Sequence, residues 1–424
     1  MMNTLGEVMR KYQAISADAH VEVAPTAWTE RMPANLRDKA PKVVQVEGGG
    51  DAVQIGDSEP APLGLQLTGG QKYTEFVTKG LKFADKLPGT GDGAQRVTEQ
   101  DKDGTDAELL YAAVVATSLK KIKDPAVLKA IATAYNSFLQ DYCSYAPDRL
   151  LGVGVIPPTN VEDACAELER IGKMPNIRAA QLLSFPNGGE WGTYGDEPFW
   201  KLANDLGICI TAHHNFGGED KGKSHPLPGQ KDKALKLEGA VDLAMFAWLL
   251  TCDLPMPTIP ILTIEQLFLG GVLDRYPKLR FHFAEAGIGW LPYWLEQMDD
   301  RFNRHKHWAR VKLAKMPSQY VRDHISFSFQ EDHAGVALRH SIGLHNICWA
   351  SDFPHSVSDW PFSRDVRERL FGKVPGNERR KIEALNILVQ LGMMTKEERE
   401  KVSNEPLQSN VHSLKIPARN ASRS

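Results

Sequence analysis

The sequence predicts an α/β protein whose core is a (β/α)8 TIM barrel with an insertion between the first two strands. Eight short apolar runs alternate with stretches whose apolar residues recur at helical spacing, which is typical of a parallel sheet covered by helices. A chain of 424 residues suits one large barrel with insertions. No Gly-x-Gly-x-x-Gly motif follows any of the runs, which disfavours the competing arrangement, a doubly wound open sheet.

The expected strands carry nearly continuous apolar side chains, as strands buried on both faces of a parallel sheet do. Some end at a clear turn signal, such as Pro157 and Pro158 after the third run. The eight strands are expected over residues 12–18, 107–115, 150–156, 177–183, 207–213, 279–285, 325–329 and 346–352.

Helical spacing of apolar residues predicts helices between several of these strands. Asn160 stands in position to cap the first helix, and Gly207 is a stop signal for the second. The helices are expected over residues 161–171, 198–206, 235–251 and 290–302.

Residues 43–100 contain many glycines and prolines and do not fit a bare barrel. We interpret them as an insertion over the barrel mouth, where it can act as a lid. The barrel domain is expected to span residues 1–399, with a polar C-terminal tail over residues 400–424. The segment 241–260 is rich in Leu, Met and Trp, and it is equally consistent with a dimer face and with buried core.

Composition and charge exclude several classes of protein. The net charge of −3, from 50 basic and 53 acidic residues, does not suit a nucleic-acid binder or a polybasic membrane anchor. No run of about 18 apolar residues occurs, so no membrane span is expected. The five cysteines are scattered, and the first residues lack the apolar stretch of a secretion signal, which favours a cytoplasmic location.

Residues that can bind a metal ion follow four of the expected strands. Side chains at i and i+2 of a strand share a face, so Asp18 and His20 can converge on one ion. His213, Glu285 and Asp352 stand at the ends of three further strands. In a barrel these ends meet on one rim, where active sites of this fold are built. Mixed carboxylate and imidazole donors suit Zn²⁺, Mn²⁺ or Fe²⁺.

Five motifs spread over about residues 14–390 resemble the amidohydrolase-related family, in the branch that contains aminocarboxymuconate-semialdehyde decarboxylase. They are Ile-Ser-Ala-Asp-Ala-His-Val at 15–21, Asp-Gly-Thr-Asp-Ala-Glu-Leu at 103–109, Ile-Thr-Ala-His at 210–213, Phe-Ala-Glu-Ala-Gly-Ile-Gly-Trp-Leu-Pro at 283–292 and Ala-Ser-Asp-Phe-Pro-His at 350–355. The resemblance implies an enzyme in which Asp18, His20, His213 and Asp352 bind the metal. It also implies that Asp352 handles a proton of the substrate or of water.

The sequence departs from this family at two places. No lysine ends the fourth strand, where relatives with two metals carry a bridging carboxylate, so we expect one divalent cation. Zinc is expected first, with manganese or iron as alternatives. Glu285 stands where the best-known decarboxylases carry a histidine, so we expect Glu285 and His355 to join Asp352 in catalysis.

The sequence also suggests roles for three further polar residues. His214 and Gln181 are expected to contact the substrate, although a polar residue in a barrel layer is also a good interpretation of Gln181. His282 is separated from Glu285 by an odd count, and strand alternation therefore predicts that it faces the helix layer.

These residues predict a metal-dependent hydrolase or decarboxylase (a lyase) acting on a small, carboxylated organic molecule. One alternative is a non-haem iron or manganese oxygenase component that works with a paralogous subunit. Another is a structural subunit that keeps the metal for stability. We expect a homodimer or a hetero-oligomer with a related subunit, and neither nucleic acid nor membrane as a partner.

Overall fold

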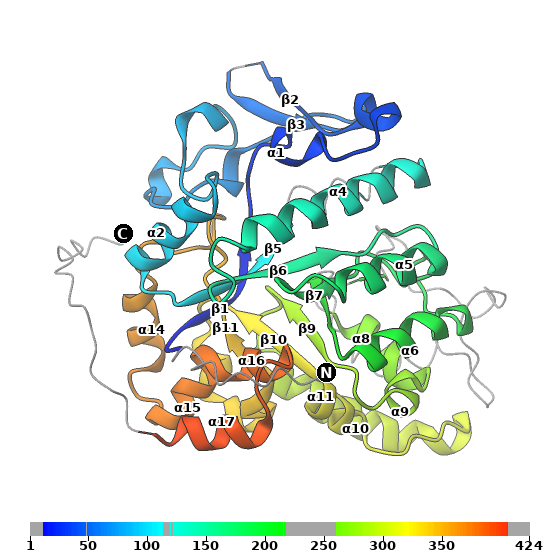
Figure 1. Cartoon of the computed structure of the whole chain (residues 1–424). Helices are drawn as coiled ribbons and strands as arrows, with labels where there is room; N and C mark the ends of the chain where they lie inside the picture. The colour runs from blue at the N-terminus through cyan, green and yellow to red at the C-terminus, as the bar shows by residue number, and fades with distance from the viewer. Residues whose placement is uncertain are drawn as a thin grey trace, which may run out of the picture.

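Eight parallel strands form the centre of the computed structural model, which describes residues 12–47, 49–112, 119, 122–214, 216–217 and 260–405. They pair in chain order, and all eight predicted strands are present. The strands are β1 (Ile15–His20), β5 (Ala107–Tyr111), β6 (Leu150–Val155), β7 (Ile177–Gln181), β8 (Cys209–His213), β9 (Phe281–Ala284), β10 (Ile325–Phe329) and β11 (Ile347–Trp349). The predicted (β/α)8 barrel is confirmed (Figure 1).

Two backbone hydrogen bonds join the first and last segments of the barrel. The Asp352 N–H donates to the Asp18 carbonyl over 2.9 Å, and the His20 N–H donates to the Phe353 carbonyl over 2.8 Å. Both bonds lie where β1 ends and where the chain leaves β11. Asp18, His20 and Asp352, three of the four residues predicted to hold the metal, are therefore part of the closure of the barrel.

Helices surround the strands, and apolar side chains between the two layers form the main core. The helix at α5 matches its prediction, and α10 continues to Ala309, beyond the predicted end at Phe302. The expected helix over 235–251 lies outside the described residues. The longer helices are α2 (Gly93–Asp103), α4 (Pro125–Cys143), α5 (Val161–Ile171), α6 (Glu197–Leu206), α8 (Ile261–Leu269), α10 (Leu291–Ala309), α11 (Pro317–His324), α14 (Ser363–Phe371) and α17 (Lys396–Ser403).

Short helical segments complete the structure. They are α1 (Thr26–Thr29), α9 (Val272–Arg275), α12 (His333–Ala337), α13 (Arg339–Ile342), α15 (Gly376–Arg380), the π-helix η7 (Lys381–Leu385), α16 (Asn386–Gln390), and the 3-10 helices η1 (Ala34–Lys39), η2 (Gly64–Gln66), η3 (Tyr73–Glu75), η4 (Phe83–Asp85), η5 (Tyr194–Asp196) and η6 (Leu344–Asn346). No helix in the described ranges is both long and apolar enough to cross a membrane.

The insertion between β1 and β5 carries its own small antiparallel sheet, β2 (Lys42–Gln45), β3 (Asp51–Gln54) and β4 (Ala61–Pro62). In Figure 1 this sheet lies at the top and the C-terminal helices at the bottom, with the barrel strands between them. The insertion also contacts the chain that follows β11. The Thr68 N–H donates to the Pro354 carbonyl over 3.1 Å, and the Gly70 N–H donates to the Trp360 carbonyl over 3.1 Å. It therefore supports the segment that carries Asp352.

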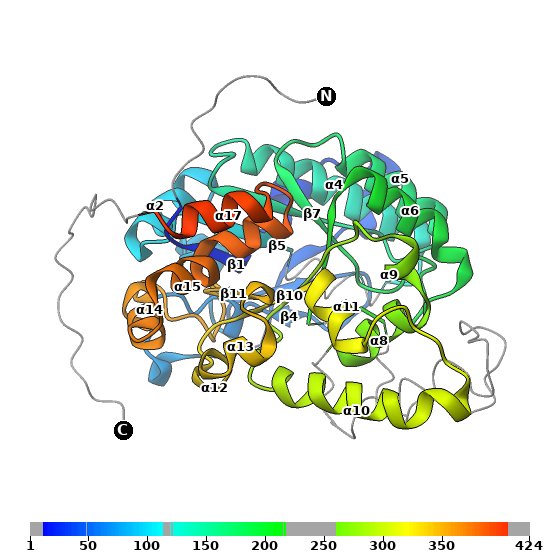
Figure 2. The same cartoon turned by 90° about the horizontal axis from the view of Figure 1, so that it is seen from below.

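The C-terminal helices cover the opposite end of the barrel. Leu385, Leu388 and Leu391 pack with Ile15 and other residues of the barrel interior in one apolar cluster. In Figure 2, where the molecule is seen from below, α15 and α17 project over the region of β1, β5 and β11. Helix α17 ends at Ser403, four residues beyond the predicted end of the barrel domain. Residues 406–424, most of the predicted tail, lie outside the described residues.

His282 lies inside the barrel, and the prediction that it faces the helix layer is wrong. Its Nδ1 is 2.8 Å from Ser326 Oγ on β10, and its Nε2 is 3.1 Å from the Ala17 carbonyl on β1. The alternation failed because Glu285 lies beyond the last residue of β9. Its φ of 53° turns the backbone, so Glu285 is not a member of the strand from which alternation can be counted.

Burial lowers the pKa of His282 to about 4, and this gives the fold a pH dependence. As the pH falls below about 6.5 the unfolded chain takes up a proton that the folded chain resists, so stability is lost toward pH 4. We expect His282→Gln to remove about 3 kcal/mol of this loss. Urea unfolding between pH 4 and pH 7, on protein from which a chelator has removed any metal, tests this prediction. His333→Gln, at an exposed histidine, is the control. Equal pH dependence in wild type and His282→Gln would contradict the prediction.

Candidate metal centre

The end of β1 brings two metal ligands to the same side of the barrel. The register between β1 and β5 shifts between Ser16 and Ala19, so the strand bulges around Asp18. Ser16 fixes this bulge, because its Oγ donates to the Asp18 carbonyl over 2.6 Å. The side chains of Asp18 and His20 are 0% and 1% exposed. Both ligands are therefore held rigidly below the surface.

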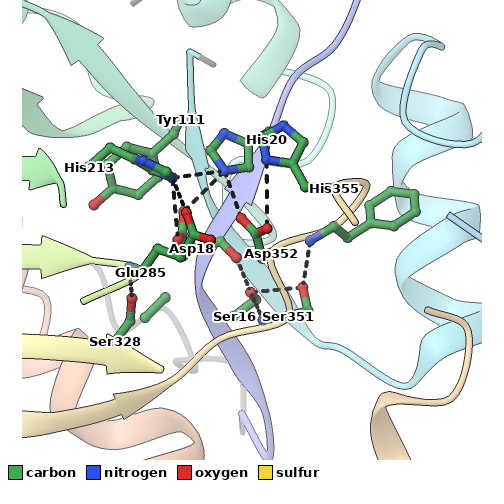
Figure 3. Close-up of polar contacts among 12 residues, drawn as sticks. Ser16, Asp18, His20, Tyr111, His213, Glu285, Ser328, Ser351, Asp352 and His355 are labelled. Carbon is green, nitrogen blue, oxygen red and sulfur yellow. Dashed lines mark hydrogen bonds and ion pairs between the residues drawn. The ribbon is translucent and has the colours of Figure 1, made fainter. Parts of the chain in front are cut away.

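The four predicted ligands converge, as Figure 3 shows. His20 Nε2 is 2.9 Å from Asp352 Oδ1, 3.2 Å from His213 Nε2 and 3.5 Å from Asp18 Oδ1. His213 Nε2 is 3.7 Å from Asp18 Oδ2. Donors bonded to one ion at about 2.0–2.2 Å lie roughly 3 to 3.5 Å from one another, which is close to these separations.

Buried atoms at this centre lack the partners that folded proteins normally provide. Both carboxylate oxygens of Asp18, Oδ2 of Asp352 and Nδ1 of His20 are buried and make no hydrogen bond. Burial, together with the negative charges of Asp352 and Glu285, raises the pKa of Asp18 well above its ordinary value. Burial also raises the pKa of Asp352 to about 8. A divalent cation would compensate this buried negative charge, so the residues fit a metal ion.

Glu285 and His214 lie beside His213 on the more exposed side of the centre. Glu285 Oε2 is 3.4 Å from His213 Nε2 and 3.2 Å from His214 Nε2. The Glu285 N–H donates to Ser328 Oγ over 3.0 Å, and this bond fixes the turn after β9. The side chains of Glu285 and His214 are 22% and 34% exposed. A molecule entering from solvent can therefore reach both.

Three residues of the centre hold backbone conformations that non-glycine residues seldom adopt. The φ angles are 63° for His214, 53° for Glu285 and 53° for Asp352. Each such residue costs of order 1–3 kcal/mol, and this kind of strain gathers at functional sites. At each of these residues the positive φ changes the direction of the backbone after the strand, and so changes where the side chain points.

His355 lies on the other side of His20 from His213. The rings of His355 and His20 stack with centroids 3.8 Å apart and planes 12° apart. His355 Nδ1 is 3.6 Å from Asp352 Oδ2, and its Nε2 is 3.0 Å from Glu22 Oε1. The side chain is 16% exposed, so His355 borders the centre without being enclosed in it.

Gln181 is buried at the end of β7, and its Oε1 makes no hydrogen bond within the described residues. No side-chain hydrogen bond joins it to the other predicted site residues in these ranges. Its contact with a substrate stays a prediction.

Sequence reasoning missed Tyr111, the last residue of β5. Its ring centroid is 5.8 Å from that of His213 and 6.2 Å from that of His20, and its hydroxyl is hydrogen-bonded to Thr211 Oγ1. The strand was expected over residues 107–115, so Tyr111 stood in its middle, whereas β5 ends at Tyr111. The strand-end argument therefore did not reach it.

Arg96, in helix α2 of the insertion, supports the ligands through their backbone. Its guanidinium donates to the His20 carbonyl over 2.9 Å and to the Phe353 carbonyl over 3.4 Å. Its Nε pairs with the buried Glu108 carboxylate at 2.5 Å. This one side chain therefore ties the insertion to two of the three chain segments that carry the predicted metal ligands.

Residues 18–388 match the family model described as amidohydrolase, a range that includes every predicted ligand. The chain belongs to the amidohydrolase family. The predicted resemblance is confirmed, and membership makes the protein an enzyme.

Individual members of the family are distant from this amidohydrolase in sequence. It is 22% identical over 289 residues, 65% of this chain and 73% of the relative, to 2-amino-3-carboxymuconate-6-semialdehyde decarboxylase of Dictyostelium discoideum. Among solved structures, an amidohydrolase from Mycobacterium avium subsp. paratuberculosis gives a TM-score of 0.63 at 15% identity, over 90% of this chain and 100% of that one. A dihydroxybenzoic acid decarboxylase from Polaromonas with bound manganese gives 0.57 at 16% identity, over 92% and 99%. The structural matches show the shared fold.

The metal centre predicts a specific loss in two isosteric variants. Loss of a residue that merely orients a ligand already lowers metal affinity about 10–100-fold, so Asp18→Asn and Asp352→Asn are each expected to lower it at least about 100-fold. Elemental analysis after dialysis against a weak chelator measures this. Asp51→Asn, a buried aspartate of the insertion sheet, is the matched control and should keep its metal. Full metal content in both site variants would contradict the assignment.

Arg96 predicts a loss of stability that a second substitution repairs. Arg96→Met leaves the Glu108 carboxylate buried without its cation, and we expect the free energy of unfolding to fall by about 3–5 kcal/mol. Adding Glu108→Gln removes the unpaired charge and should recover at least half of the loss. Denaturant titration of the wild type, both single variants and the double variant measures the coupling. Additive losses would show that the two side chains do not stabilise each other.

Proposed function

We propose that this amidohydrolase is a metal-dependent decarboxylase, a lyase, that acts on a small carboxylated substrate through a single divalent cation at the C-terminal face of the barrel. The observation that carries the proposal is the convergence of Asp18, His20, His213 and Asp352 around partnerless buried oxygens. Relatives of known activity that act on carboxylated aromatic molecules support the reaction class. Zinc is the ion we propose first, and manganese or iron are alternatives.

Three of the four ligands are deeper than the residues that border them. Asp18, His20 and Asp352 are almost fully buried, whereas the side chains of Glu285 and His214 are partly exposed. A substrate would therefore approach the centre past Glu285 and His214. A divalent cation, when bound, supplies Lewis acidity that withdraws charge from a carboxylate, phenolate or enolate oxygen.

The acids of the site perform the proton transfer. Decarboxylation requires a proton to reach the carbon that carries the carboxylate. The bond between that carbon and the carboxylate then breaks, its electron pair returns to the ring or enol, and CO₂ leaves. Asp352 can take up and deliver the proton, because its buried Oδ2 makes no hydrogen bond and lies 3.6 Å from His355 Nδ1. Solvent replaces the proton through His355, the partly exposed neighbour of Asp352 Oδ2.

Glu285 gives this chain a second acid where its best-known relatives are expected to carry a histidine. Its Oε2 lies between the Nε2 atoms of His213 and His214, on the exposed side of the centre. We assign it to hold and transfer a proton at the substrate. The same parts would serve hydrolysis if a carboxylate of the site removed a proton from water as the water attacked a substrate carbonyl carbon, and then passed that proton to the leaving group as its bond broke. A hydrolase is therefore the nearest alternative.

The remaining assignments are also proposals. Gln181 and His214 contact the substrate, and the insertion over residues 43–100 covers the site. A location in the cytoplasm fits the free cysteines in the described ranges, Cys143, Cys165, Cys209 and Cys348. We also propose a homodimer or a hetero-oligomer with a related subunit.

Release of CO₂ tests the proposed reaction. Metal-loaded protein is incubated with a panel of hydroxybenzoates and enol carboxylic acids labelled with ¹³C at the carboxylate, and labelled CO₂ is measured. Glu285→Gln should keep its metal and lower kcat about 10²–10⁴-fold, as expected when a general acid or base is removed. Asp51→Asn is again the control. Loss of metal from Glu285→Gln would make Glu285 a ligand, and product formation without CO₂ would favour a hydrolase.

A non-haem iron oxygenase is the second candidate, because two imidazoles and a carboxylate on one side of a metal suit Fe²⁺. His20, His213 and Asp352 provide such a set. Oxygen consumption by iron-loaded protein, alone and with a related subunit, distinguishes the two. Metal-dependent turnover with either chemistry excludes the structural-subunit alternative.

A further inference from the structure

Glu22 is a buried acid beside the metal centre whose role is not part of the proposed reaction. It continues the alternation that begins with Asp18 and His20, so the three residues read Asp-x-His-x-Glu. Its side chain is 4% exposed, and its Oε1 is 3.0 Å from His355 Nε2. We infer that Glu22 is a positioning residue that fixes the ring of His355, and with it the atom that faces Asp352.

The geometry leaves one arrangement of the ring. A carboxylate only accepts hydrogen bonds, so the His355 nitrogen next to Glu22 carries a hydrogen. That nitrogen is Nε2, and Nδ1 then faces Asp352 Oδ2 at 3.6 Å. In metal-binding sites, the carboxylate partner of an imidazole commonly sets its orientation and tautomer. Glu22 plays the same part for an imidazole that lies next to a ligand.

The surroundings hold both partners in place. The His355 ring is stacked on the almost fully buried His20 ring. The backbone N–H of His355 donates to the backbone carbonyl of Asp352 over 2.9 Å, and this bond fixes the turn between the two residues. On the other side, the Glu22 N–H donates to the Gly89 carbonyl of the insertion over 3.4 Å. The ring therefore lies between two segments that the fold has already fixed.

A second metal ion is the competing interpretation, since His20, Glu22 and His355 each offer a donor atom within a short distance. The stacking argues against it. Ring lone pairs lie in the plane of each imidazole, and two nearly parallel planes whose ring centroids are 3.8 Å apart direct them side by side rather than at one point. The pairing of Glu22 with His355 accounts for the same atoms without an ion.

This role deepens the proposed function, and it rests on that function only for its effect on turnover. Because the Nε2–H of His355 donates to Glu22, Nδ1 is the atom of His355 through which a proton can reach or leave Asp352 Oδ2. Without Glu22 the ring could adopt either tautomer, so its hydrogen would lie on Nδ1 in some molecules and on Nε2 in others. The metal ligands themselves would be untouched.

Nuclear magnetic resonance of the zinc-loaded holoenzyme tests the inference directly. In protein with ¹⁵N-labelled histidine, long-range ¹H–¹⁵N spectra identify which ring nitrogen carries the hydrogen, and the His355 signals are those that His355→Gln removes. We expect hydrogen on Nε2 in the wild type and a mixture of tautomers in Glu22→Ala. Glu22→Gln retains an acceptor oxygen and should keep the wild-type tautomer. Glu265→Gln, at a buried glutamate of α8, is the control.

Turnover and metal content complete the test. Glu22→Ala should keep full metal content and lower kcat about 10–100-fold with KM changed less than about threefold, and Glu22→Gln should recover part of the loss. An unchanged tautomer in Glu22→Ala would overturn the inference. So would a second equivalent of zinc that both Glu22→Ala and His355→Gln lose. If no substrate decarboxylates, the proposed function fails, while the tautomer still decides the role of Glu22.

Discussion

Buried negative charge at the end of the barrel is the constraint on which the site depends. Asp18 and Asp352 are fully buried carboxylates that accept almost no hydrogen bonds, an arrangement that a protein interior tolerates only with a compensating cation or bound protons. Their raised pKa values reflect the same cost, because burial disfavours the charged form of each carboxyl. A metal ion resolves both observations, and the two imidazoles beside the carboxylates have the geometry to share it.

The fold holds these carboxylates together by fixing backbone rather than side chains. Ser16 bonds the bulge at Asp18 and also lies 3.0 Å from Ser351 Oγ, next to Asp352. His282 reaches across the barrel to the Ala17 carbonyl, and Arg96 binds carbonyls at the ends of both segments. Repulsion between the acids is therefore opposed by bonds that leave their oxygens free. The insertion therefore contributes to the site through the hydrogen bonds of Arg96, in addition to the cover that we propose for it.

The sequence was informative where one local signal decides the structure. Continuous apolar runs located every strand of the barrel, and strand alternation paired Asp18 with His20. Prediction from the sequence failed where the backbone conformation of a turn decides the direction of a side chain. The left-handed conformation of Glu285 broke the alternation that was used for His282. The pairing of Glu22 with His355 joins residues 333 apart, and neither residue signals the other. The long contacts of a barrel are set by closure of the ring, which no local pattern contains.

Glu285 changes the charge of the centre as well as its chemistry. With Asp18 and Asp352 ionised, one divalent cation gives a neutral centre, and Glu285 adds a negative charge at its opening. Burial opposes protonation of His355, but the carboxylates of Asp352 and Glu22 outweigh it and raise the pKa of the ring. The ring that already donates from Nε2 to Glu22 can therefore take up a second proton at Nδ1, the atom that faces Asp352. The glutamate after β9 and the imidazole held by Glu22 then serve two sides of one centre, since Glu285 lies toward solvent beside His214 and His355 faces Asp352.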